Sequence, residues 1–443
     1  MSSPEAETPL TDRDRTVTAP RSQVVAWALW DTGATGVNAI VTTFVFSVYL
    51  TSTVGAGLPG PTTPASWLGR VLTAAGLVVA VLAPATGVLV DGAHRRRAAL
   101  TMLTGAVVAL TASMSLIHAD YRYLWAGLAL LACTAACSDL ATVPYNAMLR
   151  DLSSPSTSGR ISGFGLAAGY FGSVVLLLAV YVGFIAGTGD TRGALGISAT
   201  DGQPVRYAVL LAAAWFAVFA TPLLTVKSPP QAMSEPPATV GFIGAYRRLW
   251  SEIVEQWRRD HNVVYFLLAS AIFRDGLTGI FTFGAVLGVN VYGVSQSDVL
   301  LFGVCACIVA AVGAIAGGLL DDRVGSKPVI IGSLAALVAI GLIMLALSGP
   351  AAFWVCGLLL CLFIGPTQSA ARNVMLQISA EGKEGVAFGL YTTTGRAASF
   401  LAPWLFFTFI DVFGSNRAGL GGLCVVLAVG LAGMLAVRVP ARQ

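Results

Sequence analysis

Long, uninterrupted apolar segments limit how this chain of 443 residues can fold. Each is roughly 20 residues long, enough to cross about 30 Å of hydrocarbon as an α-helix. Only 11% of the residues are charged, against about 25% in soluble domains, whose surfaces must be wetted. A soluble fold is therefore excluded. Hydropathy predicts twelve spans, near residues 24–50, 67–90, 98–118, 123–147, 161–187, 206–226, 262–290, 298–320, 328–347, 351–377, 386–411 and 418–438.

The longest polar stretch divides these spans into two sets of six. It begins at Lys227-Ser-Pro-Pro and contains an amphipathic segment from about 240 to 259, which we expect to lie in the membrane interface. The polar N-terminus has no apolar region typical of a signal peptide. The predicted organisation is a disordered cytoplasmic tail, a six-helix bundle, a cytoplasmic linker, a second bundle and a short cytoplasmic tail: residues 1–22, 23–226, 227–261, 262–438 and 439–443.

Basic residues predict the orientation of the chain. An even number of spans places both ends on one side, and that side then carries most of the 26 Lys and Arg residues. Cytoplasmic loops are enriched in such residues, so we expect both ends in the cytoplasm. The opposite side has four of them in its loops, namely Arg122, Arg192, Arg206 and Arg417. The Arg-rich, Lys-poor composition suggests a bacterium, and the predicted location is its cytoplasmic (inner) membrane.

The two sets of spans resemble each other in sequence. With nearly the same displacement along the chain, Asp91 pairs with Asp322, Asn146 with Asn373, and Gly163 with Gly389. The agreement indicates a parallel repeat of six helices. Such repeats are typical of transporters whose halves rock around a shared site near the middle of the membrane.

Several motifs carry a resemblance to a known family. They are Trp30-Asp31-x-Gly33, Pro144-Tyr145-Asn146, Gly159-Arg160-x-Ser162-Gly163, Gly365-x-Thr367-Gln368-x-x-x-Arg372 and Gly389-x-Tyr391-x-x-x-Gly395-Arg396. Together they resemble the vacuole effluxer branch of the major facilitator superfamily, with one departure at Thr32, where relatives usually have Trp. The resemblance implies an all-α polytopic membrane protein of the major facilitator fold, with twelve helices in two pseudo-symmetric bundles. It also implies export of small metabolites, which for the eukaryotic member are neutral amino acids.

Two loops match the signature Gly-x-Leu-x-Asp-Arg-x-Gly-Arg-Arg/Lys of that superfamily. A carboxylate at the end of one helix can pair with Arg or with a helix N-terminus across the bundle interface. Such a contact can form in one conformation and break in another, so we expect a conformational latch weighted toward Asp91 and toward Asp322–Arg323. Loop charges without a specific role are the alternative. The latch candidates are Gly87, Asp91, Arg95, Arg96, Gly318, Asp322, Arg323, Gly325 and Lys327.

Charged residues within the spans are the main candidates for substrate binding and proton coupling, because each is costly to insert. Arg372 or Arg396 is expected to meet an anionic group, and an acid to bind an ammonium group or carry a proton. Three acids and three bases can also neutralise one another as structural ion pairs. The candidates are Asp31, Asp139, Arg274, Asp275, Arg372 and Arg396, together with the polar residues Asn38, Thr42, Asn146, Gln368, Asn373 and Tyr391.

These features predict a secondary transporter that works by alternating access. The expected substrates are amino acids or similar small polar metabolites, exported with proton coupling through a monomer in the lipid bilayer. Efflux of hydrophobic drug-like compounds and a sensor or scaffold role without transport remain the alternatives. Enzymatic activity, nucleic-acid binding, cofactors and metal sites are not expected, since the cysteines and the three histidines form no cluster typical of metal ligands.

Overall fold

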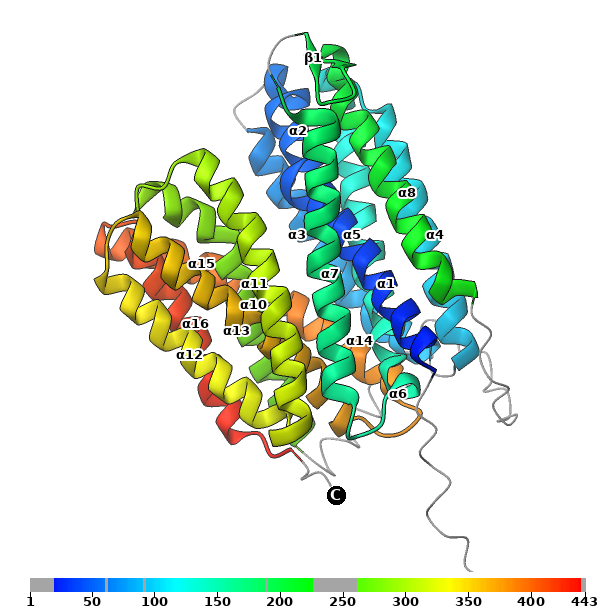
Figure 1. The fold of residues 1–443 in the computed structure, drawn as a ribbon, viewed down its shortest axis with the longest axis vertical. Coiled ribbons are helices and arrows are strands. Elements are labelled where there is room, and N and C mark those ends of the chain that lie inside the picture. Colours follow the sequence, from blue (N-terminus) through cyan, green and yellow to red (C-terminus); the bar gives the residue numbers. More distant parts are fainter. Residues whose placement is uncertain (1–19, 60–62, 91–92, 188–189, 226–260, 440–443) are drawn as a thin grey trace, which may run out of the picture.

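The computed structural model describes residues 20–59, 63–90, 93–187, 190–225 and 261–439, and these are almost entirely helical (Figure 1). Twelve helical segments in this part of the chain are long and apolar enough to cross a membrane, as the sequence predicts. The predicted N-terminal tail and linker fall largely outside these ranges, and so does Asp91.

The first six spans form the N-terminal half. Span 1 is α1 continued by a π-helical segment and α2, and span 4 ends in the short α6. A small antiparallel hairpin of β1 and β2 precedes span 6. The elements are α1 (Arg21–Asn38), η1 (Ala39–Phe44), α2 (Phe46–Ser52), α3 (Pro64–Leu89), α4 (Ala93–Ser113), α5 (Leu124–Ala147), α6 (Leu149–Leu152), α7 (Ser158–Val180), β1 (Thr191–Arg192), β2 (Ile197–Ser198) and α8 (Gln203–Thr225).

The last six spans form the C-terminal half. Five are single helices, and span 11 is broken into α14 and α15. The elements are α10 (Asn262–Asn290), α11 (Gln296–Val324), α12 (Ser326–Ala346), α13 (Pro350–Ile378), α14 (Glu384–Ala398), α15 (Leu401–Phe413) and α16 (Ala418–Ala436).

The outer surface of these helices is apolar. Side chains such as Leu77, Val218, Val355 and Phe400 are more than half exposed. A helix satisfies its own backbone hydrogen bonds, so an apolar surface around it suits a hydrocarbon environment. Polar side chains are instead concentrated inside the halves and between them.

The two halves meet through small residues at two equivalent crossings. Helix α7 packs on α11, and α3 packs on α14. A Cβ atom at Gly318 would lie 2.6 Å from the carbonyl oxygen of Gly159, and one at Gly389 would lie 2.6 Å from that of Ala83. Close backbone approach of this kind requires glycine. Both crossings therefore depend on residues of the sequence repeat.

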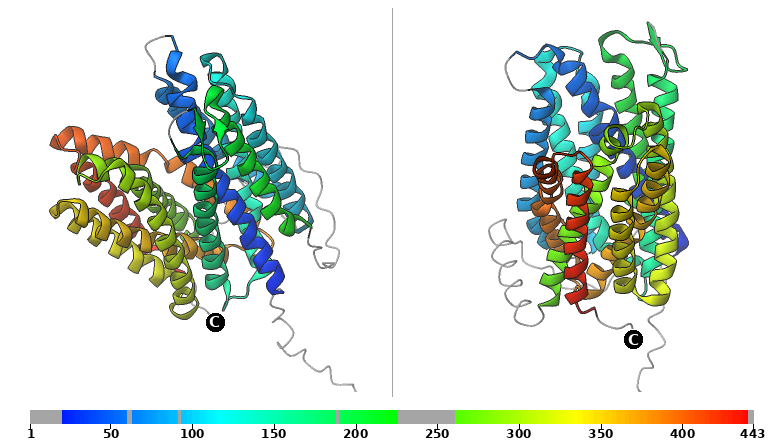
Figure 2. Two further views of the ribbon diagram at one scale, coloured as in Figure 1. Left: turned by 45° about the horizontal axis from the view of Figure 1, so that its top comes forward. Right: turned by 90° about the vertical axis from the view of Figure 1, so that its left-hand side faces the viewer.

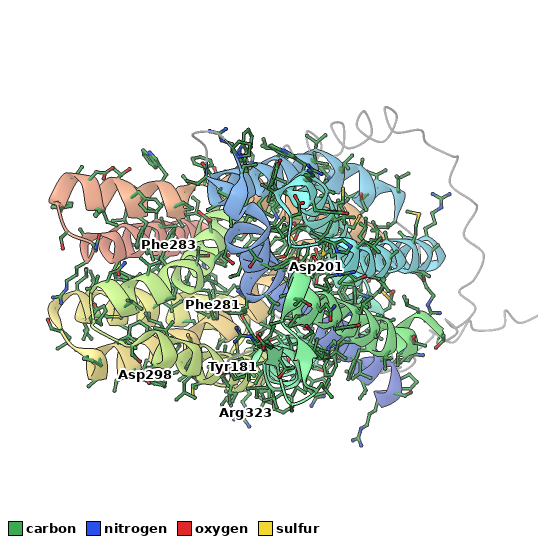
Figure 3. The ribbon with its side chains drawn as sticks, turned by 90° about the horizontal axis from the view of Figure 1, so that it is seen from above. Tyr181, Asp201, Phe281, Phe283, Asp298 and Arg323 are labelled. Carbon is green, nitrogen blue, oxygen red and sulfur yellow. The ribbon has the colours of Figure 1, made fainter. Side chains whose placement is uncertain are left out.

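The halves lie together at one end of the molecule and diverge at the other (Figures 1 and 2). They meet on the membrane side where α1 begins and α16 ends, which we call the termini side. The opposite side, with α2 and the β1–β2 hairpin, we call the far side. Seen from above, the halves lie next to each other (Figure 3). Phe281 of α10, labelled there, stacks on Tyr170 of α7, with ring centroids 6.3 Å apart.

Candidate functional site

A carboxylate and a guanidinium face each other between the halves. Asp31 lies on α1 and Arg372 on α13, with 3.9 Å between Asp31 Oδ2 and Arg372 Nη2. Their side chains are only 12% and 13% exposed. The Thr35 hydroxyl donates to Asp31 Oδ1 at 3.2 Å, whereas Asp31 Oδ2 and Arg372 Nη1 are buried without a hydrogen-bond partner. Buried polar groups are normally satisfied, so these two atoms are suited to receive a ligand.

Aromatic rings form one wall beside this pair. Tyr145 of α5 stacks between Trp27 and Trp30 of α1, with centroid distances of 4.5 and 4.4 Å. The Trp27 indole N–H donates to the Tyr145 carbonyl at 3.0 Å, which fixes α1 against α5. The guanidinium of Arg372 lies 5.6 Å from the Trp27 ring and 5.8 Å from the Tyr145 ring. These rings attract the cation and hold it in position.

A second ion pair joins the halves. Asp139 of α5 pairs with Arg396 of α14. The Asp139 side chain is 24% exposed and that of Arg396 is 41% exposed, so this pair is more accessible than the first. In both pairs the acid comes from the N-terminal half and the base from the C-terminal half. The pairs are therefore contacts between two bodies rather than ties within one bundle.

The remaining acid and base within the spans, Asp275 and Arg274, do not form an ion pair with each other in the described part of the chain. Arg274 of α10 lies over the Tyr391 ring at 3.8 Å and donates to the Tyr391 carbonyl at 2.9 Å. The buried Asp275 accepts a hydrogen bond from the backbone N–H of Ala402 at 2.6 Å. That bond caps the first turn of α15, because the first N–H groups of a helix lack partners within it. The expected neutralisation of three acids by three bases is thus incomplete.

The polar candidates divide into two groups. Gln368 accepts from the Tyr170 hydroxyl at 3.2 Å across the halves, and the amide oxygen of Asn146 is buried without a partner. Asn38 is exposed at the end of α1, and Thr42 is half-buried in the π-helical segment that follows. Neither contacts the charged residues described above.

Asn373 forms hydrogen bonds between helices, the reading that the sequence favours for each polar candidate taken singly. Its side-chain amide donates to Asp321 Oδ2 at 3.0 Å and to the Ser326 hydroxyl at 2.9 Å. All three residues are buried within the C-terminal half, at the junction of α11, α12 and α13. The geometry gives Asn373 a role in holding these helices together rather than in binding a ligand.

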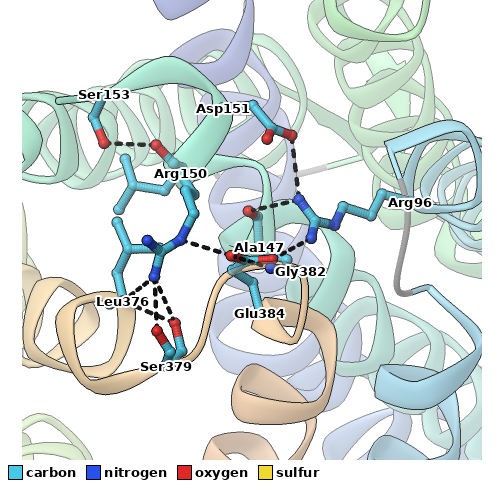
Figure 4. A network of polar contacts seen from close by, with 10 residues as sticks. Arg96, Ala147, Arg150, Asp151, Ser153, Leu376, Ser379, Gly382 and Glu384 are labelled. Carbon is cyan, nitrogen blue, oxygen red and sulfur yellow. Dashed lines mark hydrogen bonds and ion pairs between the residues drawn. The ribbon is translucent and has the colours of Figure 1, made fainter. Parts of the chain in front are cut away.

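A network of charges closes the termini side (Figure 4). Glu384, at the start of α14, accepts a hydrogen bond from Arg96 Nη2 at 2.5 Å and forms an ion pair with Arg150, with 2.7 Å between Glu384 Oε1 and Arg150 Nε. Arg150 also donates to the carbonyl oxygens of Leu376 and Ser379 at 2.6 and 2.9 Å. Both arginines belong to the N-terminal half, whereas the acceptors belong to the C-terminal half. We call the contacts of Glu384 with Arg96 and Arg150 the gate. Because Glu384 begins α14 and Arg396 lies three turns further along this helix, the gate separates the two ion pairs described above from the termini side.

The latch candidate Asp322 makes a similar contact at the other crossing. Its carboxylate accepts from the backbone N–H groups of Gly159 and Arg160 at 2.9 and 3.2 Å, and Arg160 Nε lies 3.7 Å away. A carboxylate at a helix N-terminus is favourable, because the free N–H groups carry partial positive charge. Asp322 of α11 thus caps α7 of the other half.

The remaining latch candidates have other environments. Arg323 is exposed and forms no ion pair among the described residues, so the contact across the interface is made by Asp322. Lys327 donates to the Val437 carbonyl at 2.6 Å, which ties α12 to the end of α16. Gly325 has a φ of 92°, a conformation that favours glycine, and it ends α11. Arg95 lies half-buried in α4.

Comparisons with known proteins decide the family. A family model described as "Vacuole effluxer Atg22 like" matches residues 71–442. The chain belongs to the Atg22-like vacuole effluxer family. An uncharacterized MFS-type transporter of Bacillus subtilis, YxiO, is 22% identical over 407 residues, covering 92% of each chain. Autophagy-related protein 22 of Yarrowia lipolytica is 24% identical over 58% of this chain and 46% of its own length. The chain thus spans about half the length of its fungal relatives.

Solved structures confirm the fold of this family member. The proton:xylose symporter XylE has a TM-score of 0.70 at 14% identity, with 95% of this chain and 96% of that chain covered. The transporter FucP in its outward conformation has a TM-score of 0.69 at 13% identity, with 94% and 98% covered. The Atg22-like chain therefore has the major facilitator fold.

Sequence reasoning missed two residues of the gate. Glu384 and Arg150 stand next to span ends, where charged residues commonly lie at the membrane surface. One signal pointed to Glu384. It directly precedes Gly385, which is the repeat partner of Gly159, and the backbone N–H of Gly159 donates to Asp322. An acid at that position of the repeat sits at the equivalent helix N-terminus.

Proposed function

We propose that this Atg22-like chain is a secondary active transporter that exports amino acids or similar zwitterionic metabolites by alternating access, coupled to protons. The observation that carries the proposal is the Asp31–Arg372 pair, which lies between the halves with unsatisfied buried atoms on both partners. An ammonium group would bind Asp31, and a carboxylate would bind the guanidinium of Arg372 through two parallel hydrogen bonds. A zwitterion satisfies both groups without adding net charge to the site.

Alternating access requires contacts that form on one side at a time. On the termini side, Glu384 and Asp322 each join the two halves, and the far-side segments α2 and α15 pack mainly within their own half. In the described part of the chain, most basic residues at the ends of the spans lie on the termini side, so we assign it to the cytoplasm of a bacterial cell, with the chain in the inner membrane as a monomer. The described conformation is then closed to the cytoplasm.

Asp139 is our candidate for the coupling proton. Its partner Arg396 belongs to the other half, and the carboxylate is partly exposed. Protonation would remove the charge of Asp139 and release Arg396, which breaks one of the two ion pairs between the halves. Proton binding would therefore favour a different arrangement of the halves. Asp31, by contrast, is needed in its charged form to bind an ammonium group.

The test is counterflow of radiolabelled amino acids in proteoliposomes, with and without a pH gradient. We expect saturable flux that falls at least tenfold in Arg372→Gln and Asp31→Asn, since a charge-assisted hydrogen bond contributes about 1.5–3 kcal/mol. Arg417→Gln is the matched control, because Arg417 contacts Ser348 and Leu345 within the C-terminal half. Asp139→Asn should retain counterflow but lose acceleration by the gradient.

Absence of flux for every amino acid, with protein that remains folded in detergent, would reject this substrate class. Lipophilic efflux or a sensor role would then be the readings to pursue. Unchanged flux in Arg372→Gln would instead place the site elsewhere.

A further inference from the structure

We propose that Arg274 forms an additional anion-binding subsite, so that the preferred substrate is an amino acid with an acidic side chain rather than a neutral one. This inference rests on the proposed function, because it adds a third contact to a zwitterion already held by Asp31 and Arg372. It assigns a net charge to the substrate, which neither the fold nor the family gives.

The environment of Arg274 leaves most of its hydrogen-bonding capacity unused. One guanidinium N–H donates to the Tyr391 carbonyl at 2.9 Å, and the cation lies 3.8 Å from the Tyr391 ring centroid. On its other side it packs on Gly395, where an added Cβ would lie 3.0 Å from Arg274 Nη1. The remaining N–H groups have no acceptor among the described residues, and they are not among the atoms buried without a partner. Arg274 is half-buried, and these N–H groups are free to donate to a ligand carboxylate that reaches them.

The charges of the site do not balance around Arg274. The two acids of the N-terminal half, Asp31 and Asp139, face Arg372 and Arg396. Asp275 follows Arg274 in sequence, but its carboxylate caps α15 through Ala402. No carboxylate lies within 4 Å of the Arg274 guanidinium in the described part of the chain, and its helix α10 packs on α13, which carries Arg372, and on α14, which carries Arg396. The site thus holds one cation without a counter-charge.

An uncompensated cation at membrane depth is costly and is commonly retained for function. A neutral amino acid brings one ammonium and one carboxylate, which Asp31 and Arg372 would satisfy, and leaves Arg274 as it was. An acidic amino acid brings a second carboxylate, which can accept a bidentate pair of hydrogen bonds from a guanidinium. Its net negative charge would also complete the charge balance of the site. A basic amino acid would instead add repulsion.

Two isosteric pairs test the inference: glutamate against glutamine, and aspartate against asparagine, each as a competitor of counterflow in proteoliposomes. We expect the wild-type chain to prefer the acid of each pair by about tenfold or more, as for a lost hydrogen bond to a charged group. Arg274→Gln should lower competition by the acid to that of its amide, and a single symmetric elution peak in detergent shows that the variant is folded. Arg274→Lys should keep part of the preference, because it keeps the charge.

Each outcome separates this inference from the proposed function. Equal competition by the acid and its amide in the wild-type chain would overturn the acidic subsite but leave amino acid transport standing. If Arg274→Gln still prefers the acid over its amide, another residue recognises the charge of the substrate side chain, and the assignment to Arg274 is overturned. No flux with any amino acid would overturn both proposals.

Discussion

Replacing Glu384 with Gln tests whether the termini side is held closed by one buried carboxylate. The Glu384 side chain is 2% exposed, and its oxygens form ion pairs with Arg96 at 2.5 Å and with Arg150 at 2.7 Å. Gln keeps nearly the same volume but carries no charge. The substitution therefore removes the electrostatic part of both contacts while the packing around the start of α14 is preserved.

The size of the effect follows from burial. Breaking a buried pair by removing one partner costs about 3–5 kcal/mol. Arg150 is 30% exposed, and Arg96 keeps a second partner in Asp151 at 3.2 Å. The free-energy cost of losing each contact is therefore reduced. We expect about 3 kcal/mol against the state closed on the termini side. Since each 1.4 kcal/mol is a factor of ten, the ratio of closed to open states should fall by about 100-fold.

Pulsed electron paramagnetic resonance can measure this shift in a variant without native cysteines. Spin labels at Ser156 and Glu381, exposed positions on loops of opposite halves, report separation on the termini side. We expect Glu384→Gln to move the distance distribution to longer values. Asp201→Asn is the matched control, since Asp201 pairs with Arg206 within the N-terminal half. An unchanged distribution in Glu384→Gln would refute the gate.

Two further perturbations test the interface between the halves. Gly318→Val should reduce counterflow at least tenfold in a folded protein, because its Cβ would lie 2.6 Å from the Gly159 carbonyl oxygen. Gly332→Ala should leave counterflow unchanged, because no atom lies within 4 Å of the new Cβ. Asp139→Arg and Arg396→Asp should each abolish gradient-driven flux, and the double exchange should restore part of it if the two residues act as a pair. No recovery in the double variant would mean that each residue acts separately.

The helical spans could be predicted from sequence because hydropathy and length alone decide them. The break in span 11 has one local cause: Pro403, in the first turn of α15, has no N–H to donate to the carbonyl of Ser399, where α14 gives way to α15. Proline alone does not predict the break, because Pro366 lies within the unbroken α13. The capping carboxylate that accepts from the N-terminus of α15 comes from Asp275 on α10, a contact between distant segments.

The site was predicted in its residues but not in its pairing. Asp31, Asp139, Arg372 and Arg396 stand out because charges are rare within spans. Which acid meets which base depends on how α1 faces α13 and how α5 faces α14, and local sequence does not carry that information. For Asn373, polarity within a span predicts a hydrogen bond between helices, but the sequence does not name Asp321 as its partner.

Competition by truncated substrates tests most directly whether Asp31 and Arg372 hold a zwitterion. For an amino acid that the chain transports, counterflow is challenged with the analogue that lacks the ammonium group and with the one that lacks the carboxylate. The account predicts weak competition by both in the wild-type chain. Asp31→Asn should reduce the difference in competition between the amino acid and the analogue without the ammonium group, and no other. Arg372→Gln should reduce only the difference between the amino acid and the analogue without the carboxylate. Full competition by either analogue in the wild-type chain would contradict this assignment.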